Sequence, residues 1–355
     1  MKMKHLATIS ALLVLLALAA FGVNRWMGGS ALPERVGQSI MPDLDMARLA
    51  KIVIESNEGS VTLNAGKGTP WTVAEQHDFP VDTKKINGLI LKLSQGKVAH
   101  LITAKPEKLG GLGLLKPEEN EGKREKEKTG VSIRILDSED KPMFQIIMGN
   151  ERRGQGASTF GGTYARFPDN TQAYLISESV ISEFKPEDWI DTVVLDVDGK
   201  KTIKSIRIEK PGQLPLTMTR DEPESEWKVE GIAADKVNQS EVTSMVNQLA
   251  GLNIFKVARK NAPPSETGRK KTGTVRFDFF DRRSFTVDVG MDKSEDEFRY
   301  LSIQASLPPE VEDAGLKEQV EEFNRRFSAR LVAVYDWDGG RLLRERKDFT
   351  VKKEK

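Results

Sequence analysis

A run of glycine and arginine residues is the part of this sequence best suited to binding an anion. Gly149 is followed by Asn-Glu-Arg-Arg-Gly-Gln-Gly, which brings together Arg152, Arg153, Gly154 and Gly156. Backbone N–H groups of glycines and the guanidinium fork of arginine bind phosphate or carboxylate groups. A dinucleotide site also needs a helix directly after the glycines, whereas residues 163–166 have the pattern of a strand. The run is therefore interpreted as a long hairpin loop, and these four residues are the predicted contact site for a partner or ligand.

A second motif, Asp-x-Asp-Gly, occurs at Asp196 and at Asp336 and resembles the start of a calcium-binding loop. An EF-hand needs a bidentate glutamate at its twelfth position, which holds Arg207 in the first instance and Lys347 in the second. Turn residues flanked by strands explain these aspartates better, so no metal site is predicted.

The chain has few histidines that could take part in catalysis. Beyond the N-terminal segment only His77, beside Asp78, and His100 are present, and no nucleophile-elbow serine motif accompanies them. No spacing singles out the carboxylate pair of a glycosidase. We therefore predict no catalytic residue and no cofactor, and expect that the chain is not an enzyme.

Charge and cysteine content exclude several further classes. The 54 Lys and Arg residues nearly balance the 53 Asp and Glu residues, which gives no argument for nucleic acid as a partner. The chain has no Cys, so it has no disulfides, no thiolate metal site and no acylated lipoprotein cysteine.

The N-terminus contains an uncharged run from Leu6 to Val23, preceded by Lys2 and Lys4. As a helix this run measures about 27 Å, close to the thickness of a bilayer core. The basic residues before it favour a single-pass signal-anchor with a cytoplasmic N-terminus, in the bacterial inner membrane, with the bulk of the chain in the periplasm. The competing interpretation is a signal peptide that is cleaved after an Ala-x-Ala-like site.

The chain repeats one pattern at a constant offset of 156 residues. Trp71-Thr72-Val73 precedes Asp82 and an apolar stripe at Ile86, Leu89, Ile90 and Leu93; Trp227-Lys228-Val229 precedes Asn238 and a stripe at Val242, Met245, Val246 and Leu249. The stripes predict amphipathic helices with Asp82 and Asn238 as N-caps, and Glu241 has the position that a capping box uses. A repeated unit of this length predicts a duplicated fold.

Alternating apolar residues predict strands before and after each of these helices. Hairpins are expected around 138–140 and 281–283, and further helices over 178–184 and 309–330. The second Asp-x-Asp-Gly is interpreted as the start of a truncated third copy, closed by a terminal strand. The Gly/Arg loop and a charged insertion over 116–128 belong only to the first copy.

The predicted fold class is α+β, with two tandem repeats of antiparallel strands and a covering helix, preceded by one transmembrane helix. The predicted parts are a membrane anchor or signal segment (1–27), a tether (28–43), a first repeat (44–195), and a second repeat with a C-terminal strand extension (196–355).

The order of these segments resembles a known family. An N-terminal anchor, the Trp-x-Val strand, Leu112-Gly113-Leu114, a strand ending in Met148-Gly149 and the segment Trp189-Ile190-Asp191-Thr192 together are similar to the family called domain of unknown function 4340. The resemblance implies a membrane-anchored bacterial envelope protein, often associated with gliding-motility-type ABC transport components. It implies no catalytic residues.

Two functions follow from these observations. The first is a non-enzymatic periplasmic accessory or scaffold of a transporter-like envelope complex, with a membrane protein as partner. The alternative is a periplasmic ligand-binding module for an envelope glycan or lipid, which would use Arg152 and Arg153.

Overall fold

The computed structural model describes residues 35–66, 68–103, 105–116, 128–153, 160–168, 171–179, 184–267, 272–290 and 298–351. The predicted anchor Leu6–Val23 and most of the charged insertion lie outside these residues. Among the helices within them, none is long and apolar enough to cross a membrane.

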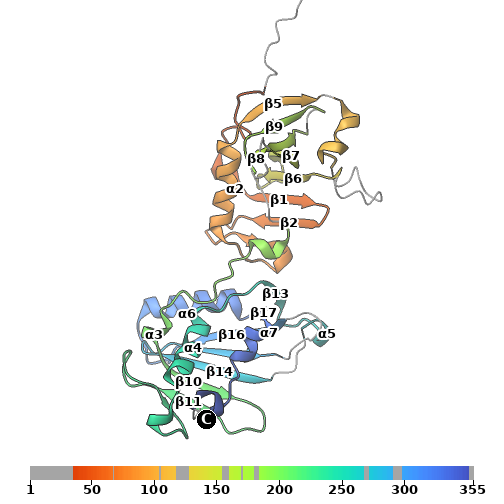
Figure 1. The fold of residues 1–355 in the computed structure, drawn as a ribbon. Coiled ribbons are helices and arrows are strands. Elements are labelled where there is room, and N and C mark those ends of the chain that lie inside the picture. The colour runs from red at the N-terminus through yellow and green to blue at the C-terminus, as the bar shows by residue number, and fades with distance from the viewer. Residues whose placement is uncertain are drawn as a thin grey trace, which may run out of the picture. The chain divides into compact units, whose positions relative to one another are not determined.

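The described residues form a mixed α+β structure with two antiparallel sheets and few helices (Figure 1). This confirms the predicted class. One sheet has nine strands in the order β4-β3-β2-β1-β6-β7-β8-β9-β5, and the other has eight in the order β12-β11-β10-β14-β15-β16-β17-β13. By contacts the chain divides into two compact units, the first made of Met1–Met46, Leu89–Arg134 and Met143–Ser182, the second of Ala47–Gly88, Ile135–Pro142 and Glu183–Lys355.

The nine-stranded sheet contains the predicted strands and two further ones, β4 and β5, and the predicted hairpin turn has the expected chemistry. Its strands are β1 (Lys51–Ser56), β2 (Gly59–Asn64), β3 (Thr72–Val73), β4 (Phe79–Pro80), β5 (Val98–Thr103), β6 (Val131–Leu136), β7 (Pro142–Arg153), β8 (Phe160–Arg166) and β9 (Ala173–Ile176). At the predicted hairpin after β6, the amide of Asp137 donates to the carbonyl of Lys141 and Asp140 adopts a positive φ of 59°. Asp and Asn tolerate this left-handed conformation better than most residues.

Helix α2 (Thr83–Gln95) begins where the sequence predicts it. The Asp82 carboxylate accepts a hydrogen bond of 3.0 Å from the Lys84 amide, which satisfies one of the free amides of the first turn. Ile86, Leu89 and Leu93 are buried along one face. The predicted N-cap and apolar stripe are confirmed.

The eight-stranded sheet contains β10 (Ile203–Glu209), β11 (Leu216–Thr219), β12 (Lys228–Val229), β13 (Lys256–Arg259), β14 (Gly273–Phe279), β15 (Ser284–Val289), β16 (Phe298–Ser306) and β17 (Arg330–Tyr335). The helices of this part of the chain are α3 (Gly199–Thr202), α4 (Gln239–Ala250), α5 (Pro264–Thr267), α6 (Ala314–Phe327) and α7 (Asp336–Arg341). Strand β14 alternates buried and more exposed residues, so one face of the sheet forms the core.

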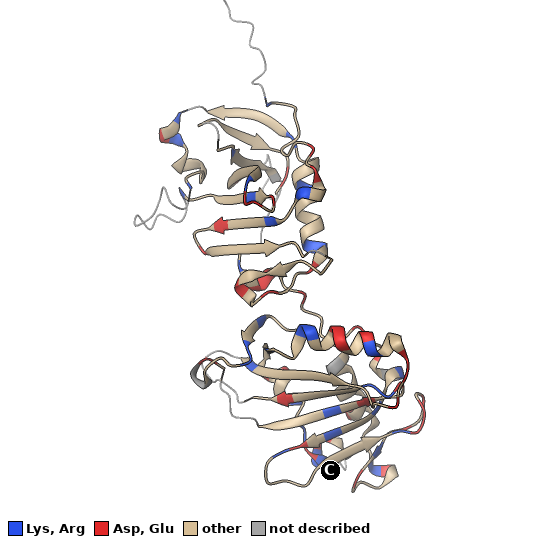
Figure 2. Ribbon diagram, turned by 180° about the vertical axis from the view of Figure 1, so that it is seen from behind, with Lys and Arg blue, Asp and Glu red and all other residues tan. Residues whose placement is uncertain are grey.

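Phenylalanines join α6 to this core. The ring of Phe323 lies edge-on to Phe285 at 5.0 Å between centroids and 4.6 Å from Phe327. The Asp313 carboxylate accepts from the Leu316 amide at 3.0 Å and fixes the helix start, which makes the helix shorter than the predicted 309–330. The opposite side of α6 mixes basic and acidic positions, as expected for a solvated face (Figure 2).

The capping box predicted for α4 does not form. The Glu241 amide donates to Asn238 Oδ1 at 3.3 Å, so Asn238 is the N-cap as predicted. However, the Asn238 amide donates to the carbonyl of Phe349 at 2.8 Å, which removes the donor that Glu241 would need. The Glu241 carboxylate instead accepts from Arg344 at 2.9 Å.

The prediction of a helix over 178–184 is wrong for the residues at its two ends, and residues 180–183 lie outside the described part of the chain. Glu178, Ser179 and Phe184 have no helical conformation. The preceding residue, Ser177, donates its amide to the carbonyl of Lys97 and so continues the pairing of β9 with β5. A short 3-10 helix, Pro186–Trp189, follows and buries the ring of Trp189.

Both Asp-x-Asp-Gly motifs lead into helices rather than into turns between strands. The carbonyl of Asp198 accepts the amides of Lys201 and Thr202 at the start of α3, and Asp336 begins α7. The two motifs therefore share one local structure, and the interpretation of Asp336 as the start of a third copy stays a prediction.

The last described residues pair back onto the chain in front of α4. Val237 and Thr350 form an antiparallel bridge, and the Val351 amide donates to the carbonyl of Lys236 at 2.9 Å. An equivalent bridge joins Val81, in front of α2, to Ile190. Each bridge directly follows a short 3-10 helix, Pro186–Trp189 or Arg346–Phe349, whose last residue is a buried aromatic.

Candidate functional site: a cationic groove beside strands β10 and β11

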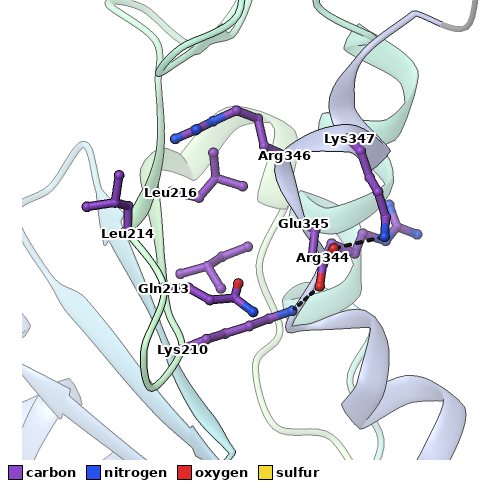
Figure 3. Close-up of a pocket in the computed structure, with 9 residues that line it drawn as sticks. Lys210, Gln213, Leu214, Leu216, Arg344, Glu345, Arg346 and Lys347 are labelled. Atoms are coloured by element: carbon purple, nitrogen blue, oxygen red, sulfur yellow. Dashed lines mark hydrogen bonds and ion pairs between the residues drawn. The ribbon is translucent and has the colours of Figure 1, made fainter.

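A groove of about 430 Å³ lies between the turn that joins β10 to β11 and the segment that leads into the 3-10 helix Arg346–Phe349. We name it the Lys210 groove. Four of its lining residues are basic, namely Lys210, Arg344, Arg346 and Lys347, and one is acidic, Glu345. Figure 3 shows Lys210 and Arg346 extending across the groove from its two opposite walls.

The strand pair β10–β11 supplies an apolar floor. Ile208 and Leu216 are paired residues of the antiparallel ladder, and both are buried. Gly212 has a positive φ of 74°, and the amide of Gln213 donates to the carbonyl of Lys210 at 3.2 Å, which closes the turn. Leu214, between this turn and β11, is 85% exposed at the edge of the groove. A single exposed apolar side chain is common on protein surfaces, so Leu214 is a candidate contact residue only because it borders the groove.

Two lysines of the groove are paired internally with one carboxylate. Glu345 lies 2.9 Å from the ammonium of Lys347 and 3.4 Å from that of Lys210. The hydrogen bonds from Lys347 and Lys210 lower the pKa of Glu345, so it is ionised at neutral pH. Arg344 is turned away from the opening and binds Glu241.

Arg346 is the basic residue of the groove that stays available. Within the described part of the chain its guanidinium has no ion pair and no hydrogen bond. It lies over Gly231, where a Cβ would be 3.2 Å from the guanidinium carbon, and Gly231 adopts a positive φ of 77°. A glycine at this turn therefore leaves the space in which the arginine is held.

The predicted contact site on β7 and its loop is described only in part. Arg152 is exposed on β7, whose pairing with β8 shifts register between Met148 and Glu151 and again before Arg153. Gly154 and Gly156 lie outside the described residues. The prediction for these four residues stays a prediction.

The two histidines lie in separate surroundings. His77 occupies a left-handed position with φ of 57° at the end of a 3-10 helix, and its carbonyl accepts from Arg330 Nη2 at 3.0 Å. Burial, and next the charge of Arg259, lowers the pKa of His77. His100 is exposed on β5. Within the described residues, no group of three or more His, Cys, Asp and Glu residues is placed to hold a metal.

A larger hollow of about 530 Å³ in the second unit is also lined by three arginines, of which Arg326 and Arg330 are engaged. Arg326 pairs with the Asp191 carboxylate at 3.0 Å and lies over the rings of Phe79 and Phe327. Arg330 donates to the carbonyls of His77, Asp78, Arg325 and Arg326. The guanidiniums of Arg326 and Arg330 therefore stabilise the chain around the hollow, whereas the Lys210 groove combines an exposed leucine with Arg346.

Sequence reasoning missed the Lys210 groove because its two walls are more than a hundred residues apart. Neither the Lys210–Leu216 turn nor the Arg344–Lys347 segment matches a binding motif. The one available signal was the basic run from Arg341 to Lys347, which contains four Lys or Arg residues next to the aspartate motif.

Two segments that support the family resemblance meet in the first unit. The strand position Gly149 packs against the Leu112–Leu114 segment so closely that a Cβ at 149 would meet the Leu112 carbonyl oxygen and lie 3.0 Å from that of Gly113. Leu114 is fully buried with Leu109, Ile147 and Ala173. No curated protein and no solved structure matches the chain. A family model does match residues 71–272, more than half of the chain, and the protein therefore belongs to the family described as domain of unknown function 4340.

Proposed function

We propose that this protein is a non-enzymatic, membrane-anchored accessory or scaffold of a transporter-like envelope complex, and that it contacts its partner through the Lys210 groove. The observation on which this rests is the groove itself, where an 85% exposed leucine stands at the edge and Arg346, which has no side-chain partner among the described residues, extends over an apolar floor. Arginine is enriched at protein–protein interfaces, and an apolar side chain beside it adds area that a partner can cover. In this proposal Leu6–Val23 anchors the chain in the bacterial inner membrane and the bulk lies in the periplasm.

The predicted tandem repeat is part of the proposal. With β4 set aside, each sheet begins with three strands in reverse chain order and continues with four strands in chain order, β6 to β9 in one sheet and β14 to β17 in the other. Each ends with the strand that follows the long helix, β5 after α2 and β13 after α4. The two matching bridges, Val81 to Ile190 and Val237 to Thr350, support the same interpretation. A duplicated scaffold leaves the differences between copies, such as the groove, to determine what is bound.

Site-specific photo-crosslinking in the native membrane tests this proposal. A photoreactive residue at Leu214 in the full-length chain is expected to capture an integral membrane protein. A photoreactive residue at Leu91, which is 52% exposed on α2, is the matched control and is expected to capture none. The absence of any membrane protein in the Leu214 adduct would contradict the proposal.

The exposure of Arg152 favours one second candidate, the glycan or lipid module. The pairing of β7 with β8 shifts register on both sides of Glu151, so β7 is irregularly paired near the predicted loop. Replacing both Arg152 and Arg153 by Ala should then weaken retention of peptidoglycan fragments or phospholipid vesicles without lowering the melting temperature. Unchanged retention would remove this candidate.

A further inference from the structure

We propose that the Lys210 groove binds an extended protein segment in which acidic residues flank large apolar ones, and that Glu345 acts as an internal competitor for its acidic side chain. This inference rests on the proposed function, because it names the partner chemistry of the same groove.

Leu214 determines the apolar part of the ligand, because it is the exposed apolar side chain that lines the groove. Ile208 and Leu216 are buried under the groove, while Leu214 is exposed at its edge. Covering a leucine side chain removes apolar area from water and favours binding. A ligand with only charged groups would leave the Leu214 side chain exposed to water.

The two walls determine the charged part. Lys210 comes from the turn after β10 and Arg346 from the opposite wall, so cations flank the apolar floor on both sides (Figure 3). The planar guanidinium of Arg346 offers two parallel donors, which match the two oxygens of a carboxylate. Because Gly231 has no side chain, it leaves room for this guanidinium beside the turn.

Glu345 shows how a carboxylate is bound in this groove. It takes hydrogen bonds from both Lys347 and Lys210, and its pKa is lowered by them. An incoming aspartate or glutamate would compete with Glu345 for the same ammonium groups. The fixed negative charge also disfavours a doubly charged phosphate more than a singly charged carboxylate. The charges and the apolar floor together favour a protein segment over a lipid headgroup or free phosphate.

Fluorescence anisotropy with the full-length chain in nanodiscs of zwitterionic lipid tests the inference. The probe is a labelled Gly/Ser peptide that contains Glu-Leu-Leu-Glu. Arg346→Ala is expected to weaken its binding roughly fivefold, as for loss of one partly exposed ion pair. Glu345→Gln is expected to strengthen it by roughly two- to fivefold, because the competing charge is removed while the side-chain shape is kept. Arg282→Ala, an exposed arginine outside the groove, is the matched control and should change nothing.

Arg346→Ala should weaken peptide binding and Glu345→Gln should strengthen it. Misfolding would weaken binding in both variants, so changes in opposite directions indicate a role in binding. Leu214→Ser should also weaken binding, by roughly threefold, while the Gln-Leu-Leu-Gln peptide should bind less well than the probe. Equal binding by the parent chain and Arg346→Ala would overturn the inference, as would failure of the parent to bind the probe. Displacement of the probe by inorganic phosphate or anionic vesicles, but not by unlabelled peptide, would assign the groove to another anion.

The proposed function can survive the failure of this inference. A Leu214 adduct with a membrane protein that persists in the Arg346→Ala background would support the accessory role and reject the acidic-segment ligand. Loss of both the adduct and peptide binding in the parent chain would reject both proposals.

Discussion

Arg344 Nη1 donates a hydrogen bond of 2.9 Å to Oε2 of Glu241 and a second of 3.2 Å to the Glu241 carbonyl oxygen. One guanidinium thus joins the first turn of α4 to the segment before the last 3-10 helix. The Arg344 side chain is 15% exposed, so water competes little for this donor.

We therefore expect Arg344→Ala to lower the free energy of unfolding by about 1 kcal/mol, as for a partly buried charged hydrogen bond. The matched control is Arg282→Ala, because Arg282 pairs with Glu310 at side-chain exposures of 53% and 63%. That change should cost no more than about 0.5 kcal/mol. Urea unfolding of the two variants checks this, and equal losses would contradict it.

Arg220 is expected to be a structural arginine that lysine cannot replace. It is 4% exposed, and it donates to the carbonyl of Ile203 from Nε at 2.8 Å and from Nη2 at 2.6 Å, and also to the carbonyl of Pro223. Its guanidinium lies 4.8 Å from the centre of the Trp227 ring. Arg220→Lys should lower the free energy of unfolding by about 2 kcal/mol, since an ammonium cannot reach all of these acceptors.

The control for this change is Arg207→Lys, at a β10 residue whose side chain is 47% exposed. Thermal unfolding followed by circular dichroism measures both variants. A loss of similar size in Arg207→Lys would show that the buried carbonyl contacts are not the cause.

Close packing at Gly149 predicts that a single methyl group there is destabilising. A Cβ would overlap the Leu112 carbonyl oxygen and lie 2.9 Å from Leu114 Cδ2, so the strand and the loop must separate. Gly149→Ala should lower the free energy of unfolding by about 1–3 kcal/mol. Gly111→Ala is the control, because a Cβ at 111 has no neighbour within 4 Å in the described residues, and it should be neutral or slightly stabilising.

The lowered pKa of Asp278 predicts that the free energy of unfolding decreases in acid. Burial by itself raises the pKa of Asp278, but hydrogen bonds from Ser284, Arg276 and Ser205 outweigh it and hold the pKa below the ordinary value. A folded-state pKa below the unfolded one means that the stabilisation is present above the unfolded pKa, near 4, and is lost as the pH falls through the folded pKa.

Unfolding free energies measured from neutral pH to below about pH 4 should therefore fall less steeply for Asp278→Asn than for the parent chain. Asp221→Asn is the control, since that carboxylate is 74% exposed and pairs only with Lys228 among the described residues. Identical pH profiles for the parent chain and Asp278→Asn would contradict the assignment.

Local signals predicted most of the secondary structure. Asp82 and the stripe through Leu93 determined helix α2 because an N-cap and a 3.6-residue period act within a few turns. The hairpin between β6 and β7 was also predictable, since alternation and turn residues lie next to each other in the sequence. The start of α6 was placed too early, because Asp313 is the actual cap.

Errors arose where a distant residue competed for a local group. Phe349 takes the Asn238 amide, so the capping box of α4 is replaced by the contact between Glu241 and Arg344. The groove was unpredictable for the same reason, because Lys210 and Glu345 meet only after folding. Sequence patterns describe neighbours in the chain, and these contacts join residues that are not neighbours.

The antiparallel bridge between Val237 and Thr350 has a practical consequence for mapping the binding surface. Residues 345–351 supply one wall of the groove and also the backbone pairing in front of α4. A truncation that removes them would be expected to disturb the fold of the second unit and the proposed binding surface in one step. Deletion series from this end would therefore mislead, whereas single side-chain exchanges at Glu345 and Arg346 can separate recognition from architecture.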